Sequence, residues 1–267
     1  MDKTFTFTFG DFAENHVGMQ QIGKKGDEEK RKKGTMTGGG LTLEELKIVR
    51  DVMEKRGLKC IIYDLGKLLL DLEKAEDHDA AYILIVKNYL SKDKANKLYI
   101  EQNSIEWDKR FWNARMKKVQ NKRARYNLVY SDKAQTAEFE KGKGTIVPWD
   151  AIPNLRAVRD DLSSCGVEKM EGMVAEGNAY YNNTTGIGWH GDAERELVVA
   201  LRVGKPMSLC YNWWFQHRSK GPKFETTLRH GDLYLMSAKA VGTDWMKKNI
   251  WTLRHSAGNP KYTKITK

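Results

Sequence analysis

The sequence has few cysteines, and their arrangement does not suggest a disulfide or zinc framework. Three occur in 267 residues, and Cys60, Cys165 and Cys210 are widely spaced without a Cys-x-x-Cys pair. An odd number of isolated thiols is typical of reduced cysteines in an intracellular protein. The sequence therefore excludes a disulfide-stapled secreted scaffold and a cysteine-based zinc site.

Long apolar runs are also missing. No apolar stretch is long enough to span a membrane, and residues 1–4 do not begin the basic and then apolar pattern of a secretory leader. We therefore expect a soluble intracellular protein, in the cytoplasm or the nucleus, without a membrane partner. We also expect it to be a monomer.

Acidic residues are outnumbered, and much of the excess positive charge lies in one segment. The chain has 46 Lys and Arg against 35 Asp and Glu, a net charge of +11. Residues 109–126 interleave cations, which neutralise phosphates, with aromatic rings, which stack on bases. The residues predicted to bind DNA or RNA are Lys109, Arg110, Trp112, Arg115, Lys117, Lys118, Lys122, Arg123 and Arg125. The alternative is a solvated helix face without a binding role.

Two segments, 190–192 and 230–232, both read His-Gly-Asp. A histidine and an aspartate two positions apart on a strand point to the same side, so one segment can provide two metal ligands. A second histidine from a distant strand completes a 2-His-1-carboxylate face. That face leaves coordination positions open and is typical of non-haem Fe(II) oxygenases. We assign His190, Asp192 and His255 to the metal.

The segment 230–232 has a different interpretation. Its Gly-Asp pair precedes the apolar run 233–236, which predicts a tight turn leading into a strand. It also lies close to His255 in the sequence, whereas several strands fit between His190 and His255. The first segment is therefore the candidate for iron, and the second is the candidate for a structural turn.

The context of the first segment resembles the AlkB-like family of Fe(II)/2-oxoglutarate dioxygenases. In that family an Asn-x-Tyr strand is followed by a polar turn and a His-x-Asp-x-Glu segment. Asn178 and Tyr180 have this spacing, and residues 190–194 read His-Gly-Asp-Ala-Glu. Residues 230–236 resemble the family's Gly-Asp strand that precedes the distal histidine. The resemblance covers residues 82–267.

The resemblance also implies residues for the cosubstrate 2-oxoglutarate. The family ends in an Arg-x-Asn-x-x-x-Arg strand whose arginines hold the carboxylates of 2-oxoglutarate. The residues carried over to the cosubstrate are Asn178, Tyr180, Lys261, Thr263 and Lys267. Period-two alternation would place the last three on one face of a strand. Lysine cannot form the bidentate fork of arginine, and Lys264 is the alternative anchor if the register differs.

Short strands with turn signals follow one another from residue 82 onward, which argues against a parallel doubly wound sheet. We expect a mainly β chain with flanking helices, and the resemblance implies a double-stranded β-helix, or jelly roll. Residues 82–267 are expected to form this dioxygenase domain, with a last strand over 261–266. Residues 1–78 are expected to form a small α/β module with a flexible loop at 10–40.

Local patterns predict particular elements. Alternating Thr and Phe over residues 4–9 predict a strand with one buried face. Helices are predicted over 42–56, 91–102 and 152–164, and Thr42 and Glu45 form a capping box for the first of them. The polar group at residues 14–16 reads Glu-Asn-His, and we interpret it as structural because a lone histidine beside a strand usually is.

These residues and the resemblance predict an enzyme, a dioxygenase that demethylates or hydroxylates a base in DNA or RNA, as in DNA repair. The resemblance implies that 2-oxoglutarate is oxidised to succinate and CO2 while a substrate C–H bond is hydroxylated, and an N-methyl group would then leave as formaldehyde. The base must be single-stranded or flipped from its stack. Two alternatives remain, a hydroxylase of a protein or small molecule and a nucleic-acid-binding jelly roll without catalysis.

Overall fold

The computed structural model describes residues 1–24, 33–70 and 78–265, and these are mainly β. The strands are β1 (Thr4–Gly10), β2 (Phe12–Glu14), β3 (Gln21–Gly23), β4 (Lys59–Asp64), β5 (Tyr82–Lys87), β6 (Arg110–Asn113), β7 (Lys118–Asn121), β8 (Tyr126–Ser131), β9 (Ile146–Pro148), β10 (Val174–Tyr180), β11 (Gly186–His190), β12 (Val198–Gly204), β13 (Met207–Phe215), β14 (Arg218–Leu228), β15 (Leu233–Met236) and β16 (Thr252–Gly258). The helices are α1 (Leu43–Lys55), α2 (Lys92–Ser104), α3 (Pro153–Ser163), α4 (Ala238–Val241) and α5 (Pro260–Thr263), with short 3-10 turns η1 (Gly66–Leu69), η2 (Phe139–Lys141), η3 (Trp149–Ala151) and η4 (Glu168–Met170).

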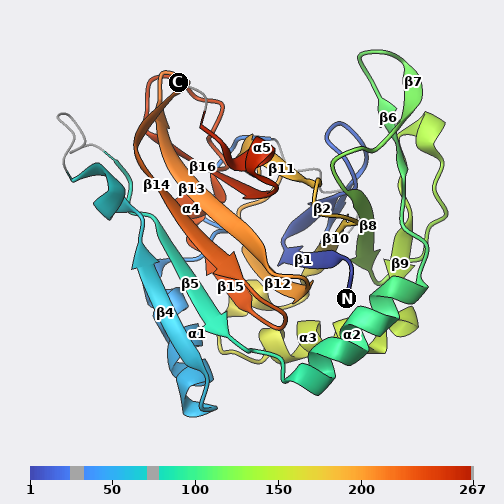
Figure 1. Ribbon diagram of the computed structural model, residues 1–267, viewed down its shortest axis with the longest axis horizontal. Coiled ribbons are helices and arrows are strands. Elements are labelled where there is room, and N and C mark those ends of the chain that lie inside the picture. The colour runs from blue at the N-terminus through green and yellow to red at the C-terminus, as the bar shows by residue number, and fades with distance from the viewer. Residues whose placement is uncertain (25–32, 71–77, 266–267) are drawn as a thin grey trace.

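Two sheets carry the core and the candidate site (Figure 1). The larger has the strand order β4-β5-β15-β12-β1-β10-β8-β9, and the smaller has the order β11-β16-β13-β14. Neighbouring strands are antiparallel except for β8 and β9. Apolar side chains of β5, β12 and β15 share one cluster with those of β13 and β16. The two sheets therefore pack face to face, as in a β-sandwich.

The first strand, β1, lies in the middle of the larger sheet between β12 and β10. Its Phe5, Phe7 and Phe9 side chains belong to the core that includes the inner faces of α1, α2 and α3. Thr6 and Thr8 point the other way and line a cavity. The alternating segment is thus a strand, as predicted, but both of its faces are covered rather than one.

The expected division near residue 80 does not separate two sheets. Residues 1–78 contribute β1 and β4 to the same sheet that residues 82–267 complete. The phenylalanines of β1 and the helices α2 and α3 also share one core. Sheet and core therefore run across the expected boundary, which corrects the expectation of a separate N-terminal module.

The loop expected over 10–40 has ordered structure in its first part. Strands β2 and β3 pair with each other, and Ala13 and Ile22 pack against Val129 and Ile146. Residues 25–32 of this loop lie outside the described residues. The polar group at the end of β2 is thereby held against the larger sheet.

The three predicted helices are confirmed, and the predicted capping box at Thr42 and Glu45 is formed at the start of α1. The strand expected over 261–266 is wrong. Asn259 caps a short helix, α5, whose first residue is Pro260, and both residues are typical of a helix start. Within the described residues, no helix has the length and apolar character needed to cross a membrane.

Phe7→Ala tests whether β1 is a core strand. Phe7 is fully buried, so we expect the free energy of unfolding to fall by about 3–5 kcal/mol. Chemical denaturation measures this change, and Val17→Ala is the control because Val17 is 78% exposed. A loss of less than about 1 kcal/mol for Phe7→Ala would contradict a core position.

Candidate metal centre

Three side chains predicted as metal ligands lie together between the two sheets. The Nε2 atoms of His190 and His255 lie 3.6 and 3.8 Å from Oδ1 of Asp192. One ligand atom from each residue lies within 4.8 Å of the other two. These separations slightly exceed the roughly 3.0–3.4 Å between ligands bound about 2.1 Å from one ion. A small inward shift of the side chains would therefore let all three bind a single metal ion.

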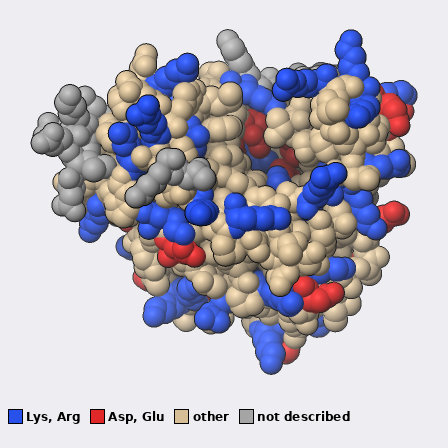
Figure 2. Space-filling model, turned by 45° about the horizontal axis from the view of Figure 1, so that its top comes forward, with Lys and Arg blue, Asp and Glu red and all other residues tan. Residues whose placement is uncertain are grey.

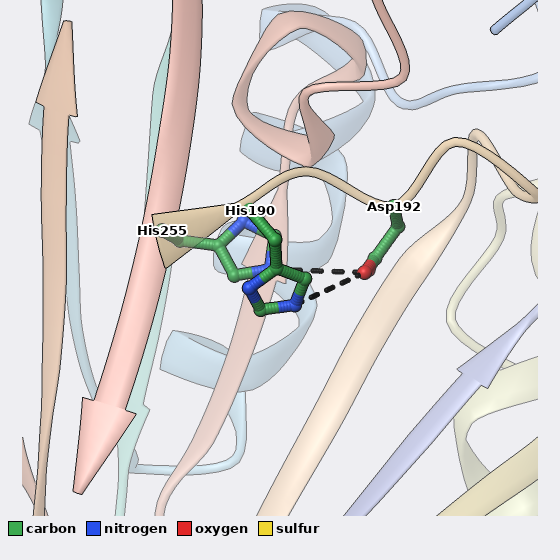
Figure 3. A group of neighbouring side chains, drawn as sticks. All are labelled: His190, Asp192 and His255. Carbon is green, nitrogen blue, oxygen red and sulfur yellow. Dashed lines mark ion pairs between the residues drawn. The ribbon is translucent and has the colours of Figure 1, made fainter. Parts of the chain in front are cut away.

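Strand pairing explains why distant residues meet here. His190 ends β11, and the antiparallel register places it directly opposite His255 on β16. The chain then leaves the strand at Gly191, where a Cβ atom would lie 2.0 Å from the carbonyl oxygen of Gly242. Only glycine fits this close approach, and Asp192 follows with its carboxylate directed at both imidazoles (Figure 3).

Hydrogen bonding and burial prepare the imidazoles as neutral ligands. Nδ1 of His190 lies 2.7 Å from the carbonyl oxygen of Gly188, so Nδ1 carries the hydrogen and Nε2 keeps its lone pair for a metal. Burial lowers the pKa of His190 to about 4, with a smaller contribution from Arg125. Burial and the neighbouring His190 also hold the pKa of His255 well below its usual value. Both rings are therefore uncharged at neutral pH.

Asp192 differs from the other acids that line the cavity. Arg195 pairs with Glu176 and Glu194, and each of these carboxylates therefore already has a cation. Among the described residues, the basic side chains that lie within 4 Å of the Asp192 carboxylate are the two uncharged histidines. Burial raises the pKa of its carboxyl group. A bound divalent cation would supply the positive charge that this carboxylate lacks.

The site opens into a cavity of about 150 Å³ between the sheets. Asn178 and Tyr180, the predicted cosubstrate residues of β10, line it. Oδ1 of Asn178 accepts hydrogen bonds from Arg125 and Asn127. Figure 2 shows a hollow with acidic atoms inside and lysine and arginine side chains around its rim.

The C-terminal residues predicted for the cosubstrate do not line this cavity. Lys261 and its alternative Lys264 are exposed, and Nζ of Lys261 lies over the ring of Tyr262, 4.9 Å from its centre. Thr263 is buried within α5, away from the cavity lining. Lys267 lies outside the described residues. The prediction failed because it assumed a strand, whereas the Asn-Pro pair before Lys261 begins a helical turn.

The basic segment forms a hairpin rather than a helix face. Strands β6 and β7 pair with each other and project from the body of the protein (Figure 1). The exposed cations on or beside it are Lys109, Arg110, Arg115, Lys117, Lys118 and Arg123, while Trp112 is half-buried. Arg125 lines the cavity instead. Lys122 is buried and donates to the side chains of Asn15 and Asn127, so it is not available to a phosphate.

The second His-Gly-Asp segment forms the expected turn before β15. Gly231 has a φ of +89°, and the carboxylate of Asp232 accepts from the backbone N–H groups of Asn88 and Arg229. Nδ1 of His230 accepts from the backbone N–H of Gly204. This segment therefore supports the larger sheet and does not contribute to the metal centre.

Several cavity residues were not predicted. Glu14 and His16, interpreted as structural, line the cavity, and so do Thr6 and Arg202. Arg202 had a signal in the sequence, because it is a lone charge in the apolar run 198–203. Glu14 and His16 had no such signal. Their position in the cavity depends on where β1, which precedes them in the chain, pairs within the larger sheet.

Asp192→Asn should lower the affinity for Mn²⁺ or Co²⁺ by at least about 100-fold, since an amide is a poor ligand in place of a charged carboxylate. Titration calorimetry measures this loss. The matched control is Asp232→Asn in the second His-Gly-Asp segment, which should lower stability and leave the affinity of the folded protein for the metal unchanged. Equal metal affinity in Asp192→Asn and the wild type would contradict the assignment.

Comparison with known proteins shows that the chain is similar in sequence to a viral protein. No model of a known protein family matches it. It is 38% identical over 264 residues to the "Uncharacterized protein R156" of Acanthamoeba polyphaga mimivirus, and the match covers 98% of each chain. The chain therefore belongs to the same family as this mimivirus protein.

Proposed function

We propose that this protein is an Fe(II)- and 2-oxoglutarate-dependent dioxygenase of the AlkB-like kind, acting on a nucleic-acid base. The observation that carries the proposal is the metal centre. Two neutral imidazoles and one carboxylate without a cationic partner converge beside a cavity. Such a face leaves room at the metal for a chelating cosubstrate and O2.

The sheet arrangement supports a double-stranded β-helix. The strands β15-β12-β1-β10 of the larger sheet and β14-β13-β16-β11 of the smaller sheet give eight strands in two layers. Jelly rolls have this number of strands and this layering. In the proposed fold, the N-terminal strand β1 occupies the position between β12 and β10. The strand expected at the C-terminus does not form.

Bound Fe(II) and 2-oxoglutarate supply the oxidation, which converts O2 and 2-oxoglutarate to CO2, succinate and a hydroxylated substrate carbon. The protein's own residues hold and orient the reactants. His190, Asp192 and His255 fix the metal on the smaller sheet. Asn178 and Tyr180 face the cosubstrate from the larger sheet, and the apolar walls of the cavity limit access of water.

The basic hairpin borders the mouth of this cavity, which supports a nucleic-acid substrate. His16 lines the cavity, and its ring stacks on Phe111 of β6 with the ring centres 3.7 Å apart. Burial, and to a lesser extent Lys122, lowers the pKa of His16 to about 4, so the stacked ring is neutral. Flat rings at the mouth and cations on the adjacent hairpin are the two elements that bind single-stranded bases and phosphates.

An assay of two products tests the proposed activity. The protein is incubated with Fe(II), 2-oxoglutarate and methylated or unmethylated single-stranded oligonucleotides, and succinate and base mass are measured together. We expect succinate formation coupled to loss of a methyl group or gain of oxygen on a base. Asp192→Ala should abolish both. Succinate without a nucleic-acid product would instead favour a protein or small-molecule substrate.

Removing charge from the hairpin tests the proposed nucleic-acid interface. The triple variant Arg115→Gln, Lys117→Gln and Lys118→Gln should bind single-stranded oligonucleotides more weakly, because it loses phosphate contacts. The slope of log affinity against log salt should fall by about 2 in magnitude. The matched control removes three exposed lysines from α2, Lys92, Lys94 and Lys97, and should leave the slope unchanged. An equal effect of both variants would indicate attraction by net charge alone.

A further inference from the structure

The cavity contains a buried cation that the metal centre does not use. Arg202 lies on β12, is 1% exposed and lines the cavity from the larger sheet. Its Nη1 donates to the carbonyl oxygen of Met207 at 3.3 Å, and its Nε has no hydrogen-bond partner. No carboxylate among the described residues forms an ion pair with it. Burying a guanidinium without an anionic partner destabilises the folded protein, and binding of an anion would offset this cost.

The other arginines of the cavity are already engaged. Arg195 is paired with two carboxylates, and Arg125 is partly exposed, with its Nε donating to Asn178. Arg202 is therefore the fully buried cavity arginine that has no carboxylate partner among the described residues. It also lies on the wall opposite the histidines, since β12 belongs to the larger sheet and β11 and β16 to the smaller.

Two hydroxyl-bearing residues line the cavity beside Arg202. Thr6 of β1 is directly opposite Arg202 in the strand register, and its Oγ1 is buried without a hydrogen-bond partner. Tyr234 of β15 lines the same cavity, and the nearby charge of Arg202 opposes the effect of burial, which raises the pKa of the Tyr234 hydroxyl. On its other side, Thr6 is in register with Asn178. A cation and two hydroxyls that can donate hydrogen bonds thus converge on one part of the larger sheet.

We propose that Arg202, with the hydroxyls of Thr6 and Tyr234, binds the far carboxylate of a small dicarboxylic acid whose other end reaches the metal centre. The inference rests on the proposed function, in which this acid is 2-oxoglutarate. A guanidinium forms a bidentate fork with a carboxylate, and the hydroxyls supply further donors. Cavities of about 150 Å³ hold small organic molecules such as benzene, and a five-carbon dicarboxylic acid is somewhat larger, so it would fill this cavity. The carboxylate anchor is then Arg202 on β12, instead of Lys261.

Ligand discrimination tests the subsite separately from turnover. The Mn²⁺-loaded protein is titrated with 2-oxoglutarate and with 2-oxopentanoate, which has a methyl group in place of the far carboxylate. We expect the wild type to prefer 2-oxoglutarate by about 100-fold. Arg202→Met should abolish the preference by weakening 2-oxoglutarate alone, with Mn²⁺ affinity unchanged. Thr6→Val should weaken 2-oxoglutarate about 5- to 10-fold, and Lys261→Met should change nothing.

Stability distinguishes a binding arginine from a structural one. Without ligands, Arg202→Met should leave the thermal midpoint unchanged or raised, because it removes an unpartnered buried charge. A preference that survives Arg202→Met, or one that is lost in Lys261→Met, would overturn the inference. If the wild type binds no Mn²⁺, the proposed function fails. The subsite is then tested by titrating the metal-free protein with glutarate, and a glutarate affinity that does not depend on Arg202 would overturn the inference as well.

Discussion

The insertion of β1 between β12 and β10 is the constraint on which the rest of the structure depends. Without it, the larger sheet would separate into two parts with unpaired edges in the middle of the protein. β1 also carries two different surfaces. Its phenylalanines complete the core beneath the helices, and its threonines form part of the cavity wall. One strand therefore links the stability of the fold to the shape of the site.

This pairing has a cost in chain entropy. Thr6 pairs with Asn178 on one side and Arg202 on the other, so the N-terminal strand is held by residues from the C-terminal half of the chain. Closing such long loops is unfavourable until many contacts form together. The same pairing places Asn178, Thr6 and Arg202 in one row across three strands. The cavity wall is therefore assembled in the step that closes the sheet.

The grouping of the three candidate metal ligands could be predicted from the sequence because its signal is local, but the cavity wall depends on distant pairing. The His-Gly-Asp spacing keeps two candidate ligands close together in the chain, and the capping box at Thr42 defines a helix start by itself. Alternating Thr and Phe look the same whether a strand face meets water, helices or a cavity. Lys122 likewise resembles its exposed neighbours in the sequence, and its burial depends on Asn15 and Asn127.

The charges of the cavity also explain how a small acid and a metal could be held together. Glu176 and Glu194 share Arg195 as their cation, whereas Asp192 near the smaller sheet and Arg202 on the larger form no ion pair with a charged partner among the described residues. A divalent cation at the first and a dianionic acid reaching the second would balance these two charges. Packed sheets lie about 10 Å apart, so their separation limits the length of an acid that can bridge them. The hairpin lies outside this arrangement, so its residues can determine which substrate is recognised without altering the distance between the two sites.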